Sequence, residues 1–110
     1  MSLVEKLRKA REQQVTVGGI DFTIRRPTEL EMIEIQNQPR GRAILPYVVG
    51  WGKVTEGDLV PGGDPHPLAF DPALRDAWLI DRLDLLVPLA DAVFDAFKAH
   101  QQRLEDAKKN

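Results

Sequence analysis

Side chains that can act as catalytic nucleophiles are scarce in this chain. Its one serine is Ser2, in a terminal segment, and it contains no cysteine. A serine or cysteine nucleophile needs a neighbouring base on a rigid frame, which a flexible terminal segment does not provide. The lack of cysteine also excludes disulfides and zinc–thiolate sites. We therefore expect no catalytic residues and no enzymatic activity.

Patterns for phosphate and metal binding are also missing. The run Gly50–Lys53 places glycines beside a lysine, but it matches neither the Walker spacing nor GxGxxG. Asp64, His66 and Asp71 are near enough in sequence to meet at one loop. Because no second histidine stands at ligand spacing, we interpret them as exposed loop residues. We expect no cofactor and no metal ion.

The charged residues indicate solvated helix faces. Five aspartates of the second half follow the spacing of polar helix faces, namely Asp76, Asp81, Asp84, Asp91 and Asp95. The formal net charge is −2, and basic residues are not interleaved with aromatic ones, so we expect no nucleic-acid partner. The longest apolar runs are far too short to span a bilayer, so we expect no membrane association.

Length and composition predict one small globular domain. The chain has 110 residues, of which 43% are hydrophobic and 29% charged, an ordinary balance for a folded protein. We divide the single domain 1–110 into an N-terminal arm (1–14), a folded core (15–104) and a polar tail (105–110). The arm places Leu3, Val4 and Leu7 at helical spacing.

A β-hairpin is predicted over residues 15–25. Apolar and polar residues alternate from Val15 to Val17 and again from Ile20 to Ile24, with Gly18 and Gly19 between them. Two glycines supply the positive φ that a two-residue hairpin turn needs.

Four helices are predicted after the hairpin, over 28–37, 43–52, 71–81 and 84–104. Thr28 and Glu31 form a capping-box pattern at the first start, and Asp71-Pro72 marks the third. We expect Trp51 at the end of the second helix. The predicted class is mainly α with one N-terminal β-hairpin (α+β), a small helical bundle. Its expected core comprises Phe22, Ile24, Leu30, Ile33, Leu45, Val48, Leu74, Trp78, Leu86, Leu89, Val93 and Phe97.

Several segments together resemble a known family. They are Phe22–Glu31, Val49–Asp58, the Pro61-Gly62-Gly63 loop, Phe70-Asp71-Pro72 and Trp78–Arg82. In this order along one small chain, they are similar to tail assembly chaperones of long-tailed, siphophage-like bacteriophages and prophages. The resemblance covers residues 15–97, and no segment in it is a catalytic signature.

The resemblance implies a function in virion assembly. Such chaperones bind the tape measure protein, keep its hydrophobic helices soluble and release it as the tail tube protein polymerises around it. The expected location is the host cell cytoplasm, with no copy in the mature virion. A homo-oligomer is left open. The alternatives are a structural phage tail or head–tail connector protein, which would be retained in the virion, and a small enzyme or regulator.

The candidate partner-binding residues are apolar positions that the core needs least. They are Leu3, Val4 and Leu7 on the arm, with Tyr47 and Trp51 beside the glycine-rich turn. We include the two aromatic residues because aromatic anchors supply much of the binding energy in protein interfaces. Simple packing is the alternative for each of the five.

Overall fold

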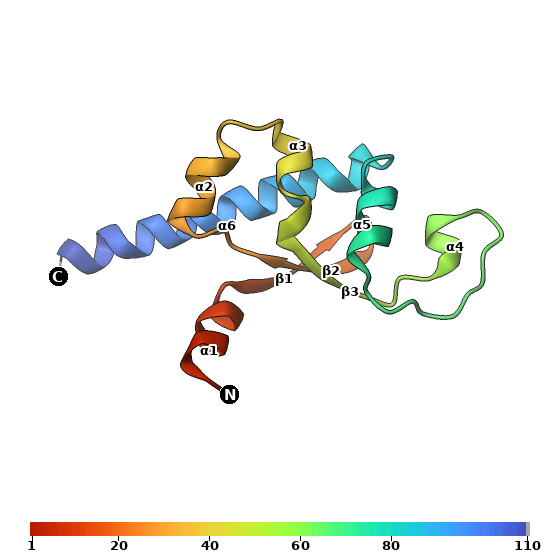
Figure 1. Ribbon diagram of the computed structural model, residues 1–110, viewed down its shortest axis with the longest axis horizontal. Coiled ribbons are helices and arrows are strands. Elements are labelled where there is room, and N and C mark those ends of the chain that lie inside the picture. The colour runs from red at the N-terminus through yellow and green to blue at the C-terminus, as the bar shows by residue number, and fades with distance from the viewer. Residues whose placement is uncertain (110) are drawn as a thin grey trace.

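A computed structural model describes residues 1–109 of the chain. A three-stranded antiparallel sheet, with its strands in sequence order, packs against the long C-terminal helix, and the N-terminal helix projects away from the sheet (Figure 1). The fold is therefore α+β, but its strands form a sheet and not a lone N-terminal hairpin.

The predicted hairpin turn is confirmed. Strands β1 (Glu12–Val17) and β2 (Ile20–Arg25) pair antiparallel, with Val15 opposite Phe22. Gly18 and Gly19 have φ angles of +59° and +76°, as a turn with two left-handed residues requires. Strand β1 starts three residues before the predicted Val15, so residues 12–14 belong to the sheet and not to the arm.

The predicted helix over 43–52 is wrong. This stretch contains the end of a one-turn helix α3 (Arg40–Ala43), a 3₁₀ turn η1 (Leu45–Tyr47) and strand β3 (Val48–Gly52), which pairs with β2. Short apolar runs are ambiguous between helix and buried strand. Gly50 lies opposite Thr23 in this pairing, and a Cβ atom at position 50 would come within 3.3 Å of the threonine Cβ. Glycine at position 50 therefore suits the close approach of β3 to β2. Trp51 therefore lies within a strand and does not end a helix.

The predicted helix starts at Thr28 and Asp71 are confirmed. Helix α2 (Glu29–Ile35) has a complete capping box between Thr28 and Glu31. The Asp71 side chain caps α5 (Pro72–Leu79) by accepting a hydrogen bond from the Ala73 amide. Two further helices are α1 (Leu3–Ala10) and the one-turn α4 (Glu56–Leu59).

Helix α6 spans Leu83–Lys109 and continues past the predicted end at residue 104. It therefore includes the segment expected to be a polar tail, except Asn110, which lies outside the described residues. Residues 101–109 are all exposed, so this part of the helix extends beyond the core, as Figure 1 shows at its blue end.

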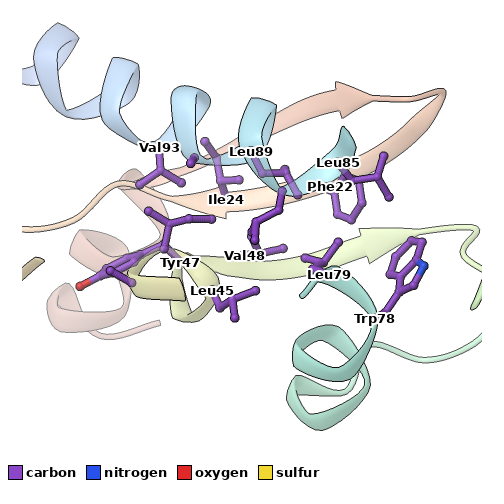
Figure 2. Packing of buried hydrophobic residues seen from close by; sticks show 14 of the residues in the cluster. Phe22, Ile24, Leu45, Tyr47, Val48, Trp78, Leu79, Leu85, Leu89 and Val93 are labelled. Atoms are coloured by element: carbon purple, nitrogen blue, oxygen red, sulfur yellow. The ribbon is translucent and has the colours of Figure 1, made fainter. Parts of the chain in front are cut away.

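The core lies between α6 and one face of the sheet. In Figure 2, Leu85, Leu89 and Val93 of α6 line up over Phe22 and Ile24 of β2. The predicted core residues that are buried are Phe22, Ile24, Leu45, Val48, Trp78, Leu86, Leu89, Val93 and Phe97.

Three predicted core residues are exposed. Leu30 is 67% exposed, Ile33 61% and Leu74 36%. In α2 the residues Met32 and Ile35 are buried instead. The helix therefore packs with the opposite face to the one predicted.

Candidate functional site

The loop residues considered for metal binding have other roles. Asp64 accepts a hydrogen bond from the amide of His66 and pairs with its imidazole, whereas Asp71 caps α5. Within residues 1–109, no three His, Asp or Glu side chains are grouped so as to hold a metal ion. The candidate functional features that remain are apolar side chains on the surface.

Helix α1 presents an apolar stripe that no other part of residues 1–109 covers. Leu3, Val4 and Leu7 are 73%, 59% and 54% exposed, and no residue of α1 is buried. Ser2 caps the helix by accepting a hydrogen bond from the Glu5 amide at 3.2 Å. A helix of eight residues needs packing for stability in water, so an exposed stripe on this helix points to a partner. We call Leu3, Val4 and Leu7 the arm stripe.

A backbone hydrogen bond attaches the end of the arm to the residue that follows β2. The amide of Arg26 donates a hydrogen bond to the carbonyl of Arg11, at 2.7 Å. This bond fixes the chain where α1 ends and β1 begins. In Figure 1, α1 extends from that point on the side of α6 opposite to α2.

Helix α2 presents a second apolar feature that the sequence did not predict. Leu30 and Ile33 stand one turn apart and are exposed, and we call this pair the α2 patch. Grooves of about 290 and 230 Å³ lie beside α2, and Met32 lines both. Phe94 and Phe97 of α6 line the first and the second groove, respectively. The Arg40 guanidinium lies 4.2 Å from the centre of the Phe94 ring at the first groove.

Tyr47 does not belong to an accessible surface. It is only 7% exposed and packs in the core cluster, with the Arg25 guanidinium 4.9 Å from its ring centre. Burial and the nearby Glu31 carboxylate raise the pKa of Tyr47 to about 12. The sequence could not reveal this burial because it depends on the 3₁₀ turn η1, in a stretch whose sequence pattern indicates a helix.

Trp51 is half-buried and is held by other aromatic residues. Its ring lies edge-on to Phe70 and to Trp78, with centroid distances of 4.9 and 5.9 Å. Its indole nitrogen donates a hydrogen bond to the carbonyl of Leu68 at 3.0 Å. Trp51 thus attaches the loop before α5 to strand β3.

The five candidate residues do not form one surface, because Tyr47 is buried and Trp51 is engaged with other aromatic residues, whereas the arm stripe is exposed.

Arg75 is a buried charged residue that sequence reasoning missed. Its Nη1 donates to the carbonyl of Val48 at 3.0 Å, and its Nε donates to Asp76 Oδ1 at 2.8 Å. A buried guanidinium with these partners ties α5 to β3. The arginine stands on the apolar stripe of α5 between Leu74 and Trp78, but sequence alone could not identify a backbone acceptor 27 residues away.

The charges around the α2 patch are acidic. Glu29 and Glu34 are exposed, and helical geometry places them on either side of the patch. Burial alone would raise the pKa of Glu31. Hydrogen bonds from Thr28 and from the Arg25 guanidinium outweigh burial, so the pKa of Glu31 is lowered. The Arg25 Nη1 lies 3.2 Å from Glu31 Oε1. Glu31 is therefore engaged within the chain.

Among residues 1–109, no helix combines the length and apolar character needed to cross a membrane. Comparisons with protein-family models, with curated proteins and with solved structures gave no match to this chain.

Proposed function

We propose that this protein is a phage tail assembly chaperone that binds apolar helical segments of a tape measure protein by non-covalent contacts. The single observation that carries the proposal is the arm stripe, because an amphipathic helix without a partner in the described part of its own chain is suited to packing against another helix. The sequence resemblance gives the identity of the client. The proposed site of action is the host cell cytoplasm, before the tail tube protein assembles around the client.

The client would pack its apolar face against the arm stripe. The α2 patch offers a second surface of the same kind, and Ile33 also lines the groove of about 230 Å³ beside it. In this proposal Tyr47 and Trp51 support the fold and do not contact the client, because both are engaged inside the chain.

Co-expression with the tape measure protein tests the proposal. Alone, the tape measure protein should aggregate, and with the chaperone it should stay soluble and co-purify. The triple variant Leu3→Gln/Val4→Gln/Leu7→Gln should lose this effect, since it removes the apolar stripe while keeping helix-forming residues.

A matched control is Leu83→Gln/Val87→Gln. These two side chains are exposed apolar residues on α6, outside the arm stripe and the α2 patch, so this variant should protect the client as the parent does. Equal solubility of the client with and without the parent protein would contradict the chaperone function.

A structural tail or head–tail connector protein is the second candidate, and the free edge of β1 favours it. Strand β1 is at the end of the sheet order and, within residues 1–109, pairs on one side only. An open edge can add a strand from a neighbouring subunit. Purified virions separate the two functions, because a structural protein is retained in them and a chaperone is absent.

A further inference from the structure

The arm carrying the arm stripe is strongly basic. Residues 3–11 contain four basic side chains and one acidic one, a formal net charge of +3. Helical spacing places Lys6 and Arg8 on either side of the arm stripe. Within residues 1–109, none of the basic side chains of this segment forms an ion pair.

The segment carrying the α2 patch has the opposite charge. Residues 28–38 contain three acidic side chains and no basic one, a formal net charge of −3. Glu31 is engaged with Thr28 and Arg25. Glu29 and Glu34 have no ion-pair partner in the described part of the chain. The α2 patch is therefore an apolar surface with unpaired negative charge at its borders.

We propose that the arm of one copy of this chain docks on the α2 patch of a second copy. Leu3, Val4 and Leu7 would pack against Leu30 and Ile33, with Lys6 and Arg8 facing Glu34 and Glu29. The proposal concerns the chain alone and needs no client.

A second copy fits better than the same chain. In Figure 1, α1 and α2 lie on opposite sides of α6, and the hydrogen bond between Arg26 and Arg11 anchors the end of α1 at the sheet. The arm therefore does not cover its own α2 patch.

The arrangement that satisfies both surfaces is a reciprocal dimer. One eight-residue helix on one patch buries less than a stable interface requires, which is of the order of 1,000 Å² in total. In a two-fold dimer each copy gives its arm and receives its partner's arm, so the same contact forms twice. We expect a weak dimer, with assembly complete only at high concentration.

Two charge-reversal variants test the pairing. The arm variant is Lys6→Glu/Arg8→Glu, and the patch variant is Glu29→Lys/Glu34→Lys. Each variant alone places like charges against each other, so its dimer should dissociate at least about tenfold more readily than the parent dimer. In an equimolar mixture both contacts of the mixed dimer are again between opposite charges, and association should recover.

Sedimentation equilibrium measures the dissociation of the parent, variant and mixed dimers at concentrations up to about 1 mM, where weak complexes become populated. Far-UV circular dichroism first checks that each variant keeps the parent helix content. Glu56→Lys/Asp91→Lys makes the same change in net charge as the patch variant, at exposed positions outside α1 and α2, and should dimerise as the parent does. Ile33→Ser removes apolar surface without changing charge and should weaken the dimer.

The proposal is overturned if the parent stays monomeric over this range. It is equally overturned if the parent dimerises and either charge-reversal variant associates as the parent does, or if the mixture of the two fails to recover association. A monomeric parent would leave the proposed chaperone function untouched, because client binding is measured in a separate experiment.

Discussion

Tyr47 is a residue at which the effect of burial in the core can be measured directly, as the pKa of its phenol. It is the one tyrosine of the chain, so its phenolate absorbance reports on a single site. Burial and the Glu31 carboxylate favour the neutral phenol and raise its pKa from 10.0 to about 12. Such a group stabilises the fold fully below its unfolded pKa of 10.0, and this contribution is lost as the pH rises toward 12.

An absorbance titration of the native protein should therefore give a midpoint near pH 12 for Tyr47. The same titration in concentrated urea should give a midpoint near 10, the ordinary value for tyrosine. A native midpoint near 10 would mean that Tyr47 is solvated, as expected for a partner-binding residue on the surface.

Trp78 offers a second prediction at the residue scale. Its ring is buried beside Phe22 and Trp51, with centroid distances of 6.1 and 5.9 Å. Trp78→Ala should lower the free energy of unfolding by about 3–5 kcal/mol, because it leaves a large cavity. Trp78→Phe should cost clearly less, since the Trp78 indole nitrogen is buried without a hydrogen-bond partner in the described part of the chain. Urea unfolding followed by circular dichroism measures both.

Trp51→Phe is the matched comparison for Trp78→Phe. It removes the hydrogen bond from Trp51 to the carbonyl of Leu68, a loss of about 0.5–1.5 kcal/mol in net stability. If Trp78→Ala unfolded at the same urea concentration as the parent, the ring would not be a core residue.

At the scale of elements, the two glycines of the hairpin turn allow the cost of backbone strain to be measured apart from the cost of a packing clash. Both of its glycines have positive φ, which is unfavourable for any residue with a Cβ atom, by about 1–2 kcal/mol. A Cβ at Gly18 would also come within 2.8 Å of a methyl carbon of Leu85, whereas one at Gly19 meets nothing within 4 Å.

Gly18→Ala should therefore destabilise the protein more than Gly19→Ala. The difference should be about 0.5–1.5 kcal/mol, the cost of moving the buried Leu85 side chain off its preferred rotamer. Thermal unfolding of the two variants side by side is the measurement. Equal melting temperatures would mean that α6 does not press on the turn.

The elements that could be predicted from the sequence are those with local signals. Gly18-Gly19, the Thr28–Glu31 capping box and Asp71-Pro72 each determine the backbone within a few residues. Strand β3 could not be predicted, because its conformation depends on the edge of β2, whose paired residues lie 24 to 31 positions earlier in the chain. The local pattern of its apolar run suits a helix equally well.

The candidate site was predictable only in part, for a related reason. The apolar spacing of Leu3, Val4 and Leu7 predicted the arm stripe, and the structure shows that it is exposed. The α2 patch was missed because Leu30, Met32, Ile33 and Ile35 extend around more than half of α2. Such a helix has no single apolar face, so tertiary packing decides which side is buried.

At the scale of the whole molecule, the arm stripe lies away from the centre. The molecule measures 55 × 34 × 21 Å along its principal axes, and the arm and the end of α6 project from the sheet (Figure 1). Partners can therefore engage the arm without disturbing the core between α6 and β2. The chaperone function and the dimer proposed above both use this separation.

Helix α6 runs close to the longest dimension of the molecule, whereas α5 stands across it (Figure 1). Peptide N–H bonds point nearly along a helix axis, so those of α6 reorient only through slow end-over-end rotation. The N–H bonds of α5 lie across the long axis, so the faster rotation about that axis also reorients them. In nitrogen-15 relaxation of the monomer, amides in the packed part of α6 should therefore show a higher R2/R1 ratio than amides of α5. Equal ratios in the two helices would indicate that the molecule tumbles as a sphere.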